Sequence, residues 1–359
     1  MRTIMHDRRL HFLVPFALPS AADAASSLHT LDSPALEKLL SRASLVERVA
    51  GEDFQRTLPH ERWLARQFGA AQGNAADEAP LAPYMLLADG GDPGDRAWAC
   101  VEPVHVEIAH DHLVLVDPAA LELEDGEAAA LLAVARPLIE ELGVRLEAPS
   151  PHRWYLSSEQ FRHLAGAAPL RASGRNIEIW LPHEAHTGER SRIWMKLQNE
   201  VQMAWFQHPV NEAREARGLP AVNSIWFHAQ GALKPVGRPF ARVLSTAPAA
   251  LGLARAARAD AGAPPAAFDQ LAAADGATLV ELSALTTPFI EQDWSSWHDA
   301  LGTMERDWFA PALAALQRGE LARVDVTLCG DTGSATLRAT RGDLRKFWRR
   351  RRALASLFE

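Results

Sequence analysis

The chain has 359 residues, of which 48% are hydrophobic and 23% charged, and its formal net charge is −8. These values are typical of a globular protein with one large or two ordinary cores, and they exclude a wholly disordered or fibrous chain. The negative charge also argues against broad non-specific nucleic-acid binding, which requires a basic surface.

The N-terminal part predicts a buried strand followed by a helix. Residues 10–16, LHFLVPF, form a short apolar run that is typical of a strand buried on both faces. Residues 8–25 also resemble a secretory signal, but two prolines break their apolar run, so the strand is the preferred interpretation. A helix is expected from Ser33 to Val49, with Ser33 as its N-cap and Pro34 in its first position.

The middle of the chain contains both the two-residue periodicity of strands and the periodicity of amphipathic helices. Residues 98–116 alternate apolar and polar side chains, which predicts one or two half-exposed strands. Amphipathic helices are expected from Asp125 to Leu142 and from Arg192 to Phe206. Further strands are expected in two later runs, residues 145–156 and 176–181.

The C-terminal half continues to alternate. It predicts strands in residues 224–231, 236–245 and 278–282, two helices in 247–274, a long helix from Trp294 to Leu316, and a closing hairpin of 324–330 with 334–340. Strands that alternate with helices favour an α/β fold, in which helices cover both faces of a mainly parallel sheet.

The cysteine and hydropathy patterns bear on location. Cys100 and Cys329 are far apart and neither belongs to a CxxC pair, so we expect no disulfide framework and no thiolate zinc site. This usage is typical of a reducing compartment, and we expect a cytoplasmic protein. No stretch approaches the roughly 20 apolar residues of a membrane-spanning helix, so we expect no membrane partner.

The segment from Gln207 to Pro235 has the densest polar pattern. Its histidine, asparagines, arginines and lysine surround turn residues, and such groups can converge on an anionic ligand. The candidates for a ligand-binding groove are His208, Asn211, Arg214, Arg217, Asn223 and Lys234. The structural alternative is that Asn211 caps a short helix, the arginines lie on its solvated face and Gly218 ends it. From the residues alone, the structural alternative is favoured.

This segment also resembles the archaeal-type cofactor-independent phosphoglycerate mutases. That family carries a similar run of His-Pro-Val-Asn, an Arg, a Gly and a Pro, and then Asn-(Ala/Ser)-Ile-Trp before a glycine. The matching residues are His208, Pro209, Val210, Asn211, Arg214, Gly218, Pro220, Asn223, Ser224, Ile225, Trp226 and Gly231. Weaker similarities follow in the same order over most of the chain.

The resemblance implies a fold and a domain organisation. The family is a branch of the alkaline-phosphatase superfamily, so we expect a doubly wound, mainly parallel sheet with a smaller inserted α+β domain. The expected domains are a core of residues 1–96 and 181–359 and an insertion of residues 97–180. The run WRRRRALA near the end is closer to a proteobacterial side branch of regulatory proteins of the RpfE type.

The residues that the mutase reaction needs are replaced in this sequence. The resemblance implies a phosphoserine and two divalent metals. The metal-binding Asp of the family's first strand is Phe16 here, and Pro59, His60 and Glu61 replace the nucleophile segment. The stretch 281–288 lacks the family's metal-binding Asp and His, and the last motif keeps at most Asp331. We therefore expect no catalytic residue, no metal and no other cofactor; Mn or Zn would be needed only by a rearranged enzyme.

Two other patterns are candidates for sites. His105, Glu107, His110, Asp111 and His112 have the density of a metal site, although the polar face of a half-exposed strand explains them equally well. The C-terminal segment is basic, with aromatic residues interspersed. Its candidate partner contacts are Arg345, Lys346, Trp348, Arg349, Arg350, Arg351 and Arg352, which suit an unknown protein with an acidic surface or a nucleic acid.

Three functional hypotheses follow from the sequence. The leading one is a non-catalytic regulatory or binding protein on a phosphoglycerate-mutase-like scaffold. The second is a metal-dependent mutase or phosphatase with rearranged ligands. The third is a nucleic-acid-associated factor that acts through the basic C-terminus.

Overall fold

The computed structural model describes residues 7–18, 33–52, 54–71, 78–161, 163–185, 187–346 and 348–349. The chain divides into two compact units. The first consists of Met1–Gln55 and Gly237–Glu359, and the second is the continuous segment Arg56–Val236.

The inserted unit is therefore larger than the expected insertion of residues 97–180. The reason is its sheet, in which β10 (Ser224–Ala232) pairs with β3 (Ala97–Val104), and its helix α4 (Ala82–Ala88), which packs against both strands. Sequence patterns show neither contact. Helix α4 lies before the expected insertion and β10 lies after it, and both meet β3 only in the folded chain.

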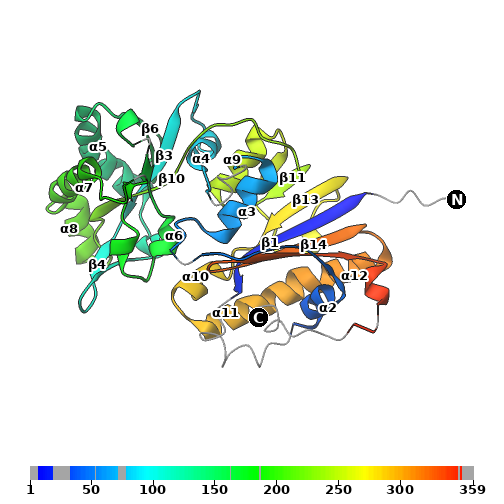
Figure 1. Ribbon diagram of the computed structural model, residues 1–359. Coiled ribbons are helices and arrows are strands. Elements are labelled where there is room, and N and C mark those ends of the chain that lie inside the picture. Colours follow the sequence, from blue (N-terminus) through cyan, green and yellow to red (C-terminus); the bar gives the residue numbers. More distant parts are fainter. Residues whose placement is uncertain are drawn as a thin grey trace. The chain divides into compact units, whose positions relative to one another are not determined.

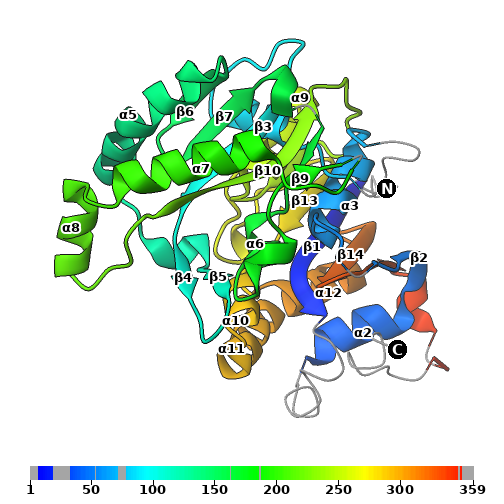
Figure 2. The ribbon, with the colours of Figure 1, turned by 60° about the vertical axis from the view of Figure 1, so that its left-hand side comes forward.

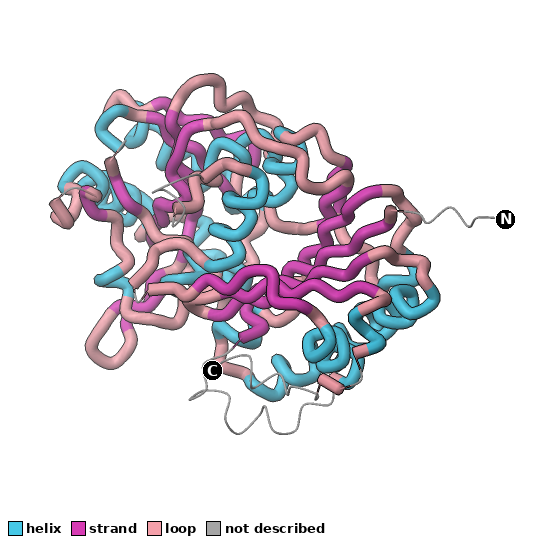
Figure 3. Tube along the Cα trace, turned by 45° about the vertical axis from the view of Figure 1, so that its right-hand side comes forward, coloured by secondary structure: helices cyan, strands magenta, loops and turns pink. Residues whose placement is uncertain are grey.

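Seven strands form the main sheet of the first unit: β1 (Arg8–Leu18), β2 (Ser44–Val49), β11 (Arg242–Leu244), β12 (Asp260–Gly262), β13 (Gly276–Glu281), β14 (Arg323–Gly330) and β15 (Ser334–Thr340). Their order is β12-β11-β13-β1-β14-β15-β2. The five strands from β12 to β14 are parallel, whereas β15 runs antiparallel to both of its neighbours, β14 and β2. Figure 3 draws the strands in magenta and the helices in cyan. The sheet thus has a parallel centre with β1 in the middle.

Helices cover both faces of this sheet, because the connections between its parallel strands run towards opposite edges. The helices are α2 (Pro34–Arg42), α9 (Pro248–Ala256), α10 (Thr286–Ile290), α11 (Trp294–Met304) and α12 (Ala310–Arg318), and short 3₁₀ turns occur at Phe268–Gln270 and Asp343–Arg345. The crossover from β11 to β12 and the one from β13 to β14 move across the sheet in opposite senses. Because both are right-handed, α9 lies on the face opposite α11 and α12 (Figure 1).

The core of the first unit forms around β1 and the α11–α12 segment. One π turn, Glu305–Phe309, joins these two helices, so the expected long helix is confirmed with a local irregularity. Phe12 contacts Trp308 and Phe309 with ring centroids 6.0 and 5.4 Å apart. The π turn also directs the buried Glu305 carboxylate at the start of α2, where it accepts hydrogen bonds from the Ala35 and Leu36 amides.

Two sequence predictions are wrong in the first unit. The helix expected from Ser33 to Val49 ends at Arg42, and residues 44–49 form the edge strand β2. This strand pairs with β15 while Leu45 and Val46 stay exposed. The second helix expected in residues 247–274 is absent, because that stretch forms β12 and a 3₁₀ turn. Strands β1, β13, β14 and β15 and helix α9 are confirmed.

The second unit contains a four-stranded antiparallel sheet with the order β10-β3-β7-β6. Two small strand pairs accompany it. The remaining strands are β4 (Val106–Ile108), β5 (Leu113–Leu115), β6 (Arg145–Ser150), β7 (Arg153–Ser157), β8 (Leu164–Ala165) and β9 (His183–Glu184). The helices are α3 (Pro59–Phe68), α4, α5 (Asp125–Glu141), α6 (Pro169–Ala172), α7 (Arg192–Trp205) and α8 (Pro209–Ala216), with 3₁₀ turns at Pro118–Leu121, Glu159–Phe161 and Ile177–Ile179.

The two faces of this sheet differ in character. One face is apolar and packs against α5 and α7 (Figure 2). Val101, Trp154 and Phe227 from the strands and Trp194 and Trp205 from α7 belong to one buried cluster on this face. Side chains alternate along a strand, so the other face carries the neighbouring polar residues. Helix α4 lies on that polar side.

The helices expected from Asp125 and from Arg192 are confirmed as α5 and α7. Residues 98–116 form β3, β4 and β5, one strand more than expected. The strand expected at residues 176–181 is wrong, because this stretch forms a 3₁₀ turn that the Asn176 side chain caps by accepting from the Glu178 amide.

The chain is thus a mixed α/β protein with a large, mostly parallel sheet, as the sequence predicts. Among the helices of the described segments, none has the length and apolar character required to cross a bilayer.

Candidate functional site

Five of the six groove candidates lie on α8 or at the amino end of β10, where their polar groups bind other parts of the second unit, whereas Lys234 follows the carboxyl end of β10. His208 is the N-cap of α8 and its Nδ1 accepts from the Val210 amide at 3.2 Å. The buried Asn211 side chain donates to the carbonyls of Trp205 and Val222 and accepts from the Val222 amide. Both residues therefore brace the turn between α7, α8 and β10.

The two arginines of α8 hold this helix to α5. Arg214 is fully buried and binds the Glu127 carboxylate at 2.5 Å and the Pro220 carbonyl at 2.9 Å. Arg217 is more exposed and pairs with Glu124 and Glu127. Burial alone would raise the pKa of Glu127. Hydrogen bonds from the Glu124 backbone amide and from the two arginines outweigh this effect, so the pKa is lowered.

The last two candidates are also engaged. The Asn223 side chain accepts from the Val106 amide and donates to the Val106 carbonyl, both at 2.8 Å. The backbone of Lys234 bonds with the Tyr84 hydroxyl. The candidates other than Lys234 therefore lie on α8 and in the turn that leads into the antiparallel strand β10. The structural alternative holds in part, with His208 in place of Asn211 as the cap and with Arg214 buried.

Aromatic side chains occupy the carboxyl end of β1, where the resembling family has a metal-binding aspartate. Phe16 is 1% exposed and its ring centroid lies 4.9 Å from that of Phe289. Phe289 contacts Trp294, which contacts Trp297, and the Trp297 indole donates to the Phe16 carbonyl at 3.0 Å. We call Phe16, Phe289, Trp294 and Trp297 the aromatic plug.

The neighbouring strand ends are equally unsuited to hold metals. At the end of β13, the buried Glu281 accepts from the Ser245 hydroxyl at 2.5 Å, and Leu285 is fully buried. Cys329 is buried in β14, and Asp331 follows in the turn before β15. Among the described residues of the first unit, no three His, Cys, Asp or Glu side chains bring ligand atoms close enough to share a metal ion.

A cavity of about 430 Å³ lies within the second unit. Apolar side chains from β3, β7, the 3₁₀ turn after β7 and β8 form much of its wall: Trp98, Leu156, Phe161 and Leu164. Its polar lining includes Arg56, Glu61, Glu78, His163, His228 and Gln230. Apolar walls with a few polar groups at this volume are typical of small-molecule sites.

A bulge in β10 shapes one side of the cavity. The pairing with β3 shifts register between His228 and Gly231, and Ala229 has φ of 58°, a left-handed conformation that costs free energy in any residue with a Cβ. Gly231 packs so closely on Pro80 that a Cβ there would lie 2.2 Å from it. The bulge places His228 and Gln230 in the cavity lining.

Glu61 in the cavity lining and its neighbour His60 have shifted pKa values. Burial raises the pKa of Glu61, against a hydrogen bond from the Leu58 amide and the charges of His228 and two arginines. Burial, with Arg171 and Arg62, lowers the pKa of His60 to about 3. His60 is therefore neutral at physiological pH.

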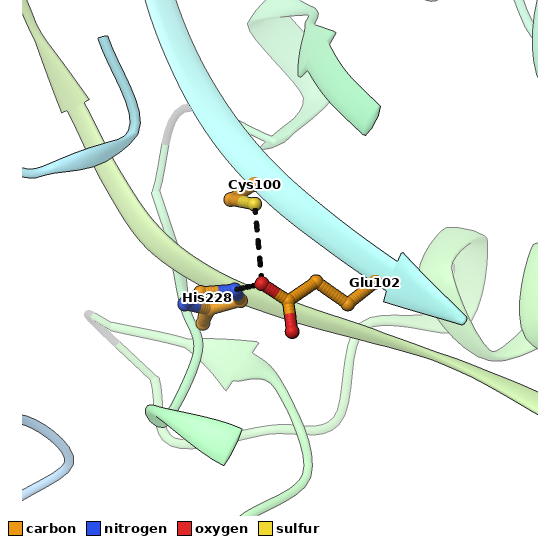
Figure 4. A group of neighbouring side chains, drawn as sticks. All are labelled: Cys100, Glu102 and His228. Atoms are coloured by element: carbon orange, nitrogen blue, oxygen red, sulfur yellow. Dashed lines mark hydrogen bonds and ion pairs between the residues drawn. The ribbon is translucent and has the colours of Figure 1, made fainter. Parts of the chain in front are cut away.

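The histidine-rich hairpin does not form a metal site. His105 lies before β4 and its Nδ1 contacts the Ala221 carbonyl at 2.5 Å, while His112 pairs with Asp111 at 2.7 Å. Within the parts of the chain that the structure describes, one group of three possible ligands comes together instead: Cys100, Glu102 and His228 (Figure 4). Sequence reasoning missed it because His228 is distant in sequence, and only the register of β3 with β10 brings it beside Cys100.

The basic C-terminal segment is partly built into the first unit. Arg345 and Trp348 are exposed, but Lys346 pairs with Asp343, and the Arg349 guanidinium donates to the carbonyls of Arg42 and Ala43 at 3.2 and 2.7 Å. Arg350, Arg351 and Arg352 lie outside the described residues.

Comparison with solved structures shows which fold this is. The PH0037 protein from Pyrococcus horikoshii aligns with a TM-score of 0.51 at 14% identity, over 94% of this chain and 88% of that chain. A cofactor-independent phosphoglycerate mutase from Thermoplasma acidophilum DSM 1728 aligns with a TM-score of 0.46 at 17% identity, over 98% of this chain and 94% of that chain. No protein-family model and no curated protein sequence matches the chain.

These similarities bear on the fold alone. The chain shares its fold with PH0037 over most of both chains, and at a TM-score of 0.46 the second alignment supports no conclusion. Neither structure supports the RpfE-type branch.

Proposed function

We propose that this protein is a non-catalytic binding protein that holds a small, largely apolar ligand in the cavity of its second unit. The observation that carries the proposal is the aromatic plug: Phe16 stands where the resembling mutases place a metal-binding aspartate, and it is buried against Phe289. A metal clamp for a phosphoryl group needs oxygen or nitrogen ligands at that edge, and aromatic carbon supplies none.

The cavity supplies a binding site that does not depend on this edge. Its apolar walls suit burial of a ring or a short hydrocarbon group, while Gln230, His228 and Arg56 offer a few polar contacts that fix orientation. The Arg56 guanidinium donates to the carbonyls of Ile179 and Trp180, so it is held in place beside the cavity.

The first test is a mutase assay. Purified protein with added manganese is expected to show no interconversion of 2- and 3-phosphoglycerate, with an active archaeal-type mutase as the positive control in the same buffer. Turnover that survives repurification and is abolished by a single substitution at Glu281 or Asp331 would establish the enzyme alternative.

The second test addresses the cavity with the fluorescent anion 1-anilinonaphthalene-8-sulfonate as probe. Ala97 is exposed and lines the cavity, so Ala97→Trp is expected to obstruct it and weaken saturable probe binding several-fold without loss of stability. Ala129→Trp is the matched control, because Ala129 is an exposed residue of α5 outside the cavity lining. Equal probe binding by the two variants would contradict a ligand site here.

A further inference from the structure

We propose that Cys100, Glu102 and His228 form a site for a zinc-type transition-metal ion beside the cavity. Cys100 and Glu102 are two residues apart on β3, so their side chains lie on the same, polar face of the sheet. His228 is the residue of β10 that pairs with Cys100 across the ladder. The sheet itself thus brings the three side chains together (Figure 4).

The distances suit a metal ion with nitrogen, sulfur and oxygen ligands. The candidate ligand atoms all lie within 4.8 Å of one another. Glu102 Oε1 is 3.4 Å from His228 Nε2 and 4.0 Å from Cys100 Sγ. Zinc bonds of about 2.0–2.3 Å in a tetrahedron separate neighbouring ligand atoms by about 3.3–3.8 Å, so only small movements are required.

A second observation concerns the hydrogen bonding of His228. This residue is 5% exposed, and its buried Nε2 atom contacts the Glu102 carboxylate at 3.4 Å but makes no hydrogen bond of good geometry. A buried polar atom left in this state is costly, and native proteins rarely contain one without a reason. A metal ion between His228 and Glu102 would use this nitrogen as a ligand.

The ligand types select the metal. Thiolate and imidazole favour zinc and related transition metals over magnesium or calcium, which prefer oxygen ligands. The Cys100 thiolate and the Glu102 carboxylate together balance a double positive charge. Behind them, Arg153 binds Asp89 through two hydrogen bonds of 2.9 and 2.7 Å, so that arginine charge is already neutralised by its own partner.

The arrangement does not suit a cysteine nucleophile. In a catalytic pair the histidine must accept the thiol proton, whereas here the Glu102 carboxylate lies between Cys100 and His228 (Figure 4). Burial, with the nearby charges of Glu102 and Asp89, raises the pKa of Cys100 well above its ordinary value. Such a thiol is inert until a metal replaces its proton.

Three protein ligands leave one position of a tetrahedral ion open. Because His228 also lines the cavity, a cavity ligand with a lone-pair donor, such as a carboxylate or an imidazole, would reach that position. The metal site goes beyond the proposed binding function, and it is tested without any organic ligand, so either proposal can fail while the other stands.

The test is titration of the metal-stripped full-length protein with cobalt(II), followed by absorption spectroscopy. Wild-type protein is expected to bind one equivalent, with visible bands of tetrahedral cobalt and a near-ultraviolet thiolate-to-cobalt charge-transfer band. Cys100→Ser should abolish the charge-transfer band and weaken binding by more than the roughly 10- to 100-fold that loss of an outer partner costs. Zinc should displace the cobalt.

The second cysteine provides the matched control. Cys329 is equally buried but lies in β14 of the first unit, so Cys329→Ser should keep the band and the affinity. Wild-type protein that binds no cobalt, or binds it without a thiolate band, would overturn the proposal with no variant needed. A band that persists in Cys100→Ser and disappears in Cys329→Ser would do the same.

Discussion

Several residues of the segment from Gln207 to Pro235, which resembles the mutases, stabilise the structure of this chain. Asn211 and Arg214 are buried and bind backbone carbonyls of the second unit, so their role in this chain is to hold the turn between α8 and β10. The difference between buried and exposed arginines on α8 provides a direct check of this interpretation.

Arg214→Ala should lower the free energy of unfolding by about 3–5 kcal/mol, because it leaves the Glu127 carboxylate without its buried partner. Arg217→Ala removes a second arginine from the same carboxylate but should cost far less, since exposed ion pairs contribute little. Urea denaturation of both variants measures the difference. Similar losses in the two would show that Arg214 is not the structural anchor.

His11 should make stability depend on pH. It is buried in β1, with Nε2 2.8 Å from the Thr327 hydroxyl and Nδ1 3.8 Å from Asp325. Burial lowers its pKa from 6.5 to about 4; Asp325 opposes this shift, and the charges of Arg323 and Arg338 add to it. The unfolded chain therefore binds a proton below pH 6.5 that the folded chain takes up only near pH 4.

The free energy of unfolding should consequently fall as the pH drops from 6.5 towards 4, by up to about 3 kcal/mol from this residue. His11→Asn should lose this part of the slope. Denaturation of both proteins at a series of pH values measures it, and His60, whose pKa is also lowered, contributes equally to both curves. Parallel curves would contradict the assignment.

At the scale of elements, the end of α2 is tied to the C-terminal segment. Arg349 donates to the carbonyls of Arg42 and Ala43, which are among the unpaired acceptors at the end of that helix. We therefore expect Arg349 to contribute to the folding of the first unit.

Arg349→Ser should therefore destabilise the first unit by about 1 kcal/mol, whereas Arg345→Ser, at an exposed position, should leave the melting temperature nearly unchanged.

The proposed acidic partner is tested separately with Arg350, Arg351 and Arg352 changed together to serine. Retention of this variant on an immobilised polyanion should be lost at lower salt than that of the wild type, because screening weakens exposed charges. Identical elution would leave these arginines without a binding role.

The local sequence pattern was sufficient to predict those elements in which the apolar residues of the pattern are also the buried ones. Strand β1 and helices α5 and α7 are of this kind. The pattern fails for β2, where Leu45 and Val46 follow the leucines of α2 but belong to an edge strand whose pairing with β15 is invisible in the sequence. It fails again at residues 176–181, where the Asn176 side chain competes with strand pairing by capping a turn.

At the scale of the whole molecule, the alternation of strands and helices along the chain was sufficient to predict a mixed α/β protein with a large, mostly parallel sheet. The candidate site needed coordinates: Cys100 and His228 meet only through the register of two strands, and the cavity is formed by residues from Arg56 to Gly231. Unit boundaries failed for the same reason, since β10 had the pattern of a core strand but pairs with β3.

The insertion of one unit into the other also sets an order of events during synthesis. In β1, Arg8 pairs with Gly276 of β13 and Arg9 pairs with Arg323 of β14. The central strand of the main sheet is therefore synthesised long before the two strands that flank it. The second unit is complete once residue 236 has left the ribosome. Because domains generally fold as units while the chain grows, the second unit should reach its native state while β1 is still unpaired. Until then, the apolar run at residues 10–16 lacks the strands that cover it in the native sheet.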